Sequence, residues 1–95
     1  MSMVRCESVT DGLRASEAVA HVRDLNGRRH SIRVERAFLD KIDGCDFLPI
    51  GVVGVDPRTG YVLVEFPQPP ETGFNRMWIE PAQLDRVIDI YGVSA

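Results

Sequence analysis

Cysteine is scarce in this 95-residue sequence, and its scarcity excludes folds that depend on covalent cross-links. The two cysteines, Cys6 and Cys45, are too few for a disulfide framework and match no Cys-x-x-Cys spacing, so we expect free thiols in a reducing compartment. Long apolar runs are also missing, whereas a transmembrane helix needs ~20 such residues. The N-terminus lacks the apolar stretch of a signal peptide. We therefore expect a cytoplasmic protein that contacts no membrane.

A surplus of positive charge is missing as well. The chain has 11 Lys and Arg residues against 14 Asp and Glu residues, which gives a net charge of −3. Proteins that bind nucleic acids through the phosphate backbone usually show the opposite balance, so generic nucleic-acid binding is disfavoured. Catalysis is not indicated either, because a nucleophile needs a base beside it and the one such pair, Ser31 and His21, lies in no predicted pocket. We expect a non-enzymatic protein without a cofactor or a metal.

What is present is the composition of a soluble globular domain. Apolar residues make up 44% of the chain and charged residues 26%, close to the usual values of roughly 45–50% and ~25%. This length corresponds to one domain. Residues 1–16 are polar and show no hydrophobic period, which predicts a flexible N-terminal arm before a single small domain over residues 17–95.

The first strong pattern is a β-hairpin formed by residues 18–24 and 28–35. A two-residue loop would mix apolar and polar side chains on both faces, whereas a three-residue loop with Gly27 at positive φ gathers the apolar ones on a single face. We therefore predict the longer loop. His21 and His30 then fall on opposite faces, so no shared metal site is expected. The predicted pairs on the apolar face are Val22 with His30, Ala20 with Ile32 and Ala18 with Val34.

Three further strands are predicted in the second half of the chain. Residues 50–56 and 61–66 flank the sequence Asp-Pro-Arg-Thr-Gly, which is typical of a tight turn. Residues 75–80 follow a proline-rich loop and form the fifth strand. The predicted cross-strand pairs are Val55 with Val62, Val53 with Val64, Gly51 with Phe66, Val62 with Ile79, Leu63 with Trp78, Val64 with Met77 and Glu65 with Arg76.

Two segments show a helical rather than a strand period. Apolar residues spaced at i, i+1 and i+4 before Gly44 predict a short connecting helix over residues 37–43. Pro81, followed by apolar residues at i, i+3, i+4 and i+7, predicts a C-terminal helix over residues 81–91. Five short strands with tight hairpins are too few for a two-sheet sandwich and suffice for a small, strongly bent barrel.

One stretch of the chain adds a resemblance to this pattern. Residues 49–84, PIGVVGVDPRTGYVLVEFPQPPETGFNRMWIEPAQL, contain a Gly- and Val-rich strand, a tight turn, a Val-rich strand and a W-I-x-x-x-x-L ending. In this order they resemble the SH3-like barrel group, which includes SH3, Tudor and KOW-type domains. The resemblance implies a mainly β, five-stranded SH3-like barrel that acts as a non-catalytic binding module. It does not extend to the acidic, aromatic loop with which true SH3 domains hold proline-rich peptides.

Two surfaces are candidates for binding. On the outer face of the second sheet we expect an apolar patch with a charged rim, suited to an unidentified protein partner or a second copy of the chain. The alternative for this patch is that the C-terminal helix or the N-terminal arm covers it. On the polar face of the first hairpin, a local excess of arginine is suited to phosphate or an acidic ligand, and a nucleic acid is the alternative partner there. The preferred interpretation of this face is a solvated surface on which the arginines pair in part with Glu35 and Asp24. The first surface comprises Tyr61, Leu63, Glu65, Arg76 and Trp78, and the second comprises Arg23, Arg29 and Arg33.

Overall fold

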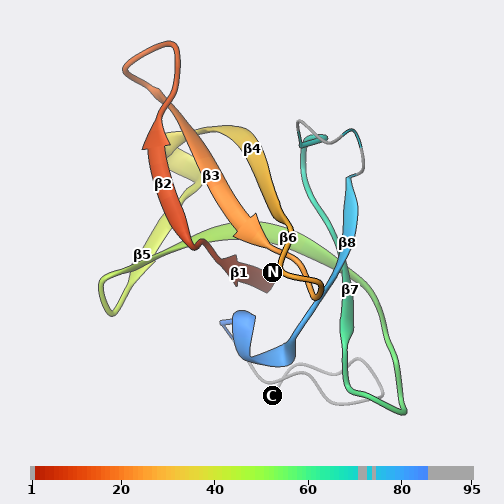
Figure 1. The fold of residues 1–95 in the computed structure, drawn as a ribbon. Coiled ribbons are helices and arrows are strands. Elements are labelled where there is room, and N and C mark those ends of the chain that lie inside the picture. The colour runs from red at the N-terminus through yellow and green to blue at the C-terminus, as the bar shows by residue number, and fades with distance from the viewer. Residues whose placement is uncertain (1, 71–72, 74, 86–95) are drawn as a thin grey trace.

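A computed structural model of the chain describes residues 2–70, 73 and 75–85. This part of the chain is mainly β, with eight short strands and two single-turn 3₁₀ helices (Figure 1). The strands are β1 (Ser2–Arg5), β2 (Ser8–Asp11), β3 (Glu17–Arg23), β4 (Arg29–Glu35), β5 (Asp40–Ile42), β6 (Cys45–Val55), β7 (Val62–Glu65) and β8 (Arg76–Ile79), and the 3₁₀ helices are η1 (Arg36–Phe38) and η2 (Pro81–Gln83).

The strands form two antiparallel sheets that share the N-terminal segment. The first sheet has the order β1-β6-β7-β8, with β5 also pairing with β6, and the second has the order β2-β3-β4. Between β1 and β2 the chain passes from one sheet to the other: the Cys6 amide donates to the carbonyl oxygen of Asp46, and the Glu7 amide to that of His21. The expectation of a flexible arm over residues 1–16 was therefore wrong for residues 2–11, which form two paired strands.

The hydrophobic core draws side chains from both sheets. It forms one cluster, in which β1 contributes Val4 and β6 contributes Leu48, both fully buried. The remaining fully buried large residues follow the alternation expected of strands with one face in the core. They are Val22, Ile32, Val62, Val64 and Ile79.

The first hairpin has the predicted register. Ala20 lies opposite Ile32, the two neighbouring pairs are also as expected, and Gly27 has a φ of +79°. Because Val22 and Ile32 are both fully buried, the choice of the three-residue loop is confirmed. The pairing of β7 with β8 is likewise confirmed at all four predicted positions.

The pairing of β6 with β7 departs from the prediction after the first pair. Val55 lies opposite Val62 as expected, but the register shifts between Val52 and Gly54, so Val64 faces Val52 and not Val53. A bulge adds one residue to one strand and turns the following side chains to the other face. As a result Val53, expected in the core, keeps 42% of its surface exposed.

Neither predicted helix is present in the described residues. The connecting segment 37–43 forms only the turn η1 and then β5, because Asp43 and Gly44 both have positive φ, 51° and 82°, and make the tight β5–β6 hairpin. An Asp-Gly pair favours such a two-residue turn. At the start of the predicted helix 81–91, η2 ends at Gln83, and Leu84 is extended and bridges to Val4. Residues 86–91 lie outside the described residues.

The predicted closed barrel is also absent from the described part of the chain. No ladder joins β4 to β8, and Figure 1 shows them as separate strands at the ends of the two sheets. We call the region between these two strand edges the seam. A single main-chain hydrogen bond, from the Leu25 amide to the carbonyl oxygen of Trp78 at 2.9 Å, crosses the seam at its turn end. Within residues 2–70, 73 and 75–85 there is no helix with the length and apolarity needed to cross a membrane.

The geometry of Gly27 gives a first prediction. A β-branched side chain does not tolerate a φ of +79°, so Gly27→Val should lower the free energy of unfolding by about 1–2 kcal/mol, measured by urea titration. Gly54→Val is the matched control, since Gly54 lies in β6 at an ordinary φ with open space around the position of a Cβ atom. Equal losses in the two variants would contradict the assigned turn.

Candidate functional site

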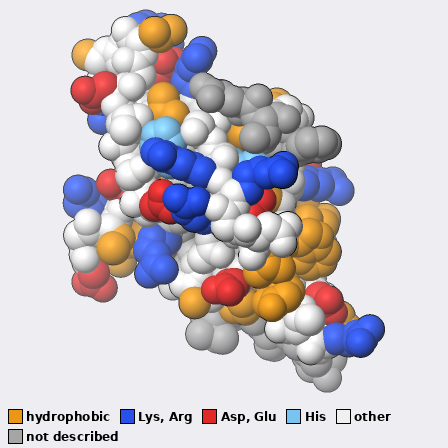
Figure 2. Space-filling model, in the orientation of Figure 1, with side chains coloured by type: hydrophobic (Ala, Val, Ile, Leu, Met, Phe, Trp, Pro, Cys, Tyr) orange, Lys and Arg blue, Asp and Glu red, His pale blue; other side chains and the backbone are white. Residues whose placement is uncertain are grey.

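The predicted apolar patch lies on the outer face of β7 and β8, as expected. Met77 and Ile79 point into the core, and the alternation of a strand therefore turns Trp78 outward. Its side chain keeps 43% of its surface exposed, and Leu63, opposite on β7, is half-buried. Figure 2 shows hydrophobic side chains gathered over the region of β7, β8 and the β3–β4 turn. We call this surface, made of Tyr61, Leu63, Glu65, Arg76 and Trp78, the Trp78 face.

A charged pair borders the Trp78 face at one end. Glu65 and Arg76 are cross-strand neighbours, and the Nε atom of Arg76 lies 3.3 Å from Oε1 of Glu65. Both side chains are about half exposed, so the pair contributes ~1 kcal/mol or less. Tyr61 directly precedes β7, has the same parity as Leu63 and is half-buried. The structure therefore brings together all five residues predicted for this surface.

Beside the Trp78 face, a pocket of about 220 Å³ occupies the turn end of the seam between β4 and β8. The β3–β4 turn supplies one wall and Trp78 part of the other. His30, which is buried, lies at the start of β4 and places its Nε2 atom 2.8 Å from Oδ2 of Asp24. The other carboxylate oxygen of Asp24 accepts the main-chain amides of Asn26 and Arg28, each at 2.9 Å. These bonds fix the shape of the turn against β8.

The same contacts set the protonation of Asp24. Partial burial acts to raise the pKa of its carboxyl group, but the hydrogen bonds from His30 and from the amides of Arg28 and Asn26 outweigh this effect. The pKa of Asp24 is therefore lower than its ordinary value of 3.8. The Asp24 carboxylate therefore stabilises the turn, because both of its oxygens accept hydrogen bonds from residues of the same hairpin.

The predicted arginine surface is largely neutralised. Arg23 forms an ion pair with Glu7 and also donates to the carbonyl oxygen of Gly27. Arg33 lies 3.9 Å from Glu17. Arg29 donates to the hydroxyl of Ser8 at 3.5 Å. The three residues share one face of the hairpin as predicted, but Glu7, which directly precedes β2, and Glu17, which begins β3, lie against two of them.

The neighbouring His21 and Ser31 side chains form a hydrogen-bonded contact that holds the sheet together. The buried ring of His21 places Nδ1 2.8 Å from the hydroxyl of Ser31 and Nε2 2.9 Å from that of Thr10. Both ring nitrogens thus contact hydroxyl groups across the sheet.

Burial, reinforced by the nearby Asp46 carboxylate, raises the pKa of the Cys6 thiol to about 12, so this buried cysteine is a weak nucleophile. Among the described residues no group of three or more His, Cys, Asp or Glu side chains is placed to hold a metal ion.

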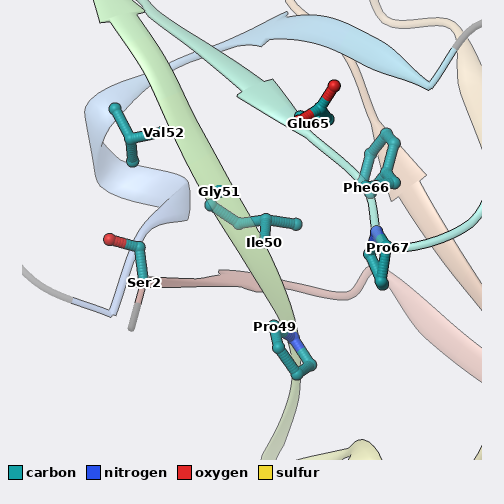
Figure 3. Close-up of a pocket in the computed structure, with 8 residues that line it drawn as sticks. All are labelled: Ser2, Pro49, Ile50, Gly51, Val52, Glu65, Phe66 and Pro67. Carbon is teal, nitrogen blue, oxygen red and sulfur yellow. The ribbon is translucent and has the colours of Figure 1, made fainter.

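The structure adds an apolar groove of about 590 Å³ that the sequence analysis missed. Figure 3 shows Phe66 and Pro67, at the end of β7, on one side of β6 and Ser2, from β1, on the other. Two sequence features signal it. Pro49 lies inside β6 and has no amide to offer to a further strand, and Gly51 has no side chain to fill the space beside it.

Comparisons of the chain with protein-family models, with curated proteins and with solved structures gave no significant match. The function must therefore be argued from the arrangement of these residues.

The Asp24–His30 pair gives a second prediction. A carboxyl group whose pKa is lowered by folding stabilises the fold above its unfolded pKa, and this stabilisation is lost as the pH falls through the folded pKa. Asp24→Asn should therefore be less stable than the wild type at about pH 5, and the difference should shrink toward about pH 2. Urea unfolding at a series of pH values measures it.

His30→Leu is the matched variant, because leucine has no hydrogen-bond donor and the Asp24 carboxylate is kept. It should flatten the pH dependence of the unfolding free energy in the same range. A difference between wild type and Asp24→Asn that stays constant with pH would show that the carboxylate contributes nothing through its charge.

Proposed function

We propose that the protein is a non-enzymatic binding module that holds a protein partner on the Trp78 face. The observation that carries the proposal is the exposure of Trp78 on β8, a strand that pairs with β7 along its whole length, next to a half-buried leucine and bordered by an ion pair. Aromatic and arginine side chains around an apolar centre are the residues that dominate the energy of protein interfaces.

Two further features support a binding role. The half-buried Leu25 and Leu63 extend the apolar surface on both sides of Trp78. The likeness of residues 49–84 to SH3-like domains favours the same class of function, because domains of that group typically bind partners without catalysis. His21 is held by two hydroxyl groups, and burial raises the pKa of the Cys6 thiol, which also favours a non-enzymatic role.

The third prediction tests this role with Trp78→Ala. Since the side chain is partly exposed, we expect the unfolding free energy to fall by only about 1–2 kcal/mol, less than the ~3–5 kcal/mol of a fully buried tryptophan. Association should be lost in the same variant. Urea unfolding and sedimentation measure stability and self-association, and cross-linking in native lysate followed by mass spectrometry identifies bound proteins.

Two control variants localise the effect. Phe38→Ala removes an aromatic side chain that is 61% exposed and lies at η1, and Gly51→Val narrows the groove beside β6. Both should retain the partners that Trp78→Ala loses. If Trp78→Ala lost stability on the scale of a core residue while its associations were unchanged, the Trp78 face would be part of the core and the proposal would fail.

The alternative function, binding of nucleic acid by Arg23, Arg29 and Arg33, is less well supported. Two of these side chains already have carboxylate partners, so phosphate would have to displace them. The fourth prediction is that the wild-type chain shows no binding to mixed RNA or DNA in fluorescence anisotropy at low salt. Binding that weakens steeply with salt, and weakens further in Arg29→Ala, would favour the alternative instead.

A further inference from the structure

The seam between β4 and β8 exposes main-chain hydrogen-bonding groups. At the β3–β4 turn the Asp24 amide donates to the carbonyl oxygen of Arg28, and bonded pairs alternate along an antiparallel ladder. The amides and carbonyls of Arg29, Ser31 and Arg33 therefore point away from β3. In the described part of the chain no strand pairs with this edge of β4.

The facing edge of β8 is exposed in the same way. The Phe66 amide donates to the carbonyl oxygen of Asn75, which sets the alternation and turns the main-chain groups of Arg76 and Trp78 outward. The contact of Leu25 confirms this direction, because its amide donates to the carbonyl oxygen of Trp78. One residue of the β3–β4 turn thus already bonds to the β8 edge as an added strand would.

The charges around the seam select what can enter it. Arg28 and Arg76 both line the pocket at its turn end. The carboxylate in that pocket, Asp24, is engaged by its own turn and by His30. The guanidinium of Arg28 forms no ion pair with any residue that the structure describes. Arg76 is paired with Glu65, so Arg28 is the cationic group of this entrance that has no carboxylate partner among the described residues. The apolar side chain of Trp78 lies beside it.

We propose that this seam binds an extended, acidic segment of a partner protein by main-chain pairing with the β8 edge. The inference rests on the proposed function and identifies the kind of partner that the Trp78 face takes. Main-chain pairing gives affinity for an extended peptide, an acidic side chain pairs with Arg28, and an apolar side chain packs on Trp78. The β4 edge of a second copy fits the β8 edge less well, because it would bring Arg29 and Arg33 of that copy against Arg76.

The test uses the full chain and random ten-residue peptides displayed on phage. Selected peptides should be rich in Asp, Glu and β-branched residues and poor in proline, which cannot donate to a strand edge. A synthetic peptide from the selection should shift the amide resonances of Arg76 and Trp78 in nuclear magnetic resonance spectra. Arg28→Glu should weaken its binding roughly tenfold or more, and N-methylation of alternate peptide amides should do the same.

The matched control is Arg58→Glu, which makes the same charge change on the exposed β6–β7 turn and should leave binding unchanged. Several results would overturn the inference: selection of no peptides, selection of proline-rich or basic ones, or undiminished binding of the N-methylated peptide. If the wild-type chain sediments as a dimer and Arg28→Glu sediments as a monomer, the occupant of the seam is a second copy of the chain and not a partner protein. If binding needs Trp78 but neither Arg28 nor peptide amides, only this inference fails. If binding survives Trp78→Ala as well, the proposed function also fails.

Discussion

The fold depends on the N-terminal segment serving two sheets at once. Val4 in β1 is fully buried, with Leu48 of β6 on one side and Leu84 bridging on the other. Two residues later the Cys6 and Glu7 amides bond to opposite sheets, so a single bend in the chain sets how the sheets meet. The outer edge of β1 is protected as well, because Met3 exchanges hydrogen bonds with Asp85 through both its amide and its carbonyl oxygen.

This arrangement explains which parts of the fold were predictable from the sequence. The hairpin β3–β4 and the pairing of β7 with β8 were predictable, because the alternation of apolar residues fixes the register of strands that bury one face. The bulge at Val53 was not predictable, because the sequence of this valine-rich strand reads the same with or without a bulge. The bulge changes only the face of the sheet to which each side chain points. The strands of residues 2–11 escaped prediction because short, polar segments gain their order from long-range pairing with β6 and β3.

The candidate site also has parts that could be predicted from the sequence and parts that could not. Trp78 and its four neighbours were placed together because strand parity alone determines an outer face. Pairing of the arginine face was expected with Glu35 and Asp24. The observed partners of Arg23 and Arg33 are Glu7 and Glu17, which were not predictable because they come from chain that was expected to be a loose arm or its boundary. The seam also escaped, since a pattern of five strands predicts closure and cannot show that β4 and β8 stay apart.

An open seam has a physical consequence for a domain of this size. Exposed strand edges promote indiscriminate pairing, and proteins commonly restrain it with charged side chains along the edge. Here Arg29 and Arg33 on β4 and Arg76 on β8 place charged side chains on both sides of the seam, and Glu17 and Glu65 pair with the last two. Such an edge disfavours pairing with itself and with other basic strands. An acidic strand would instead face Arg28 and Arg29, which form no ion pair with any described residue, and this charge pattern agrees with the acidic partner that we propose.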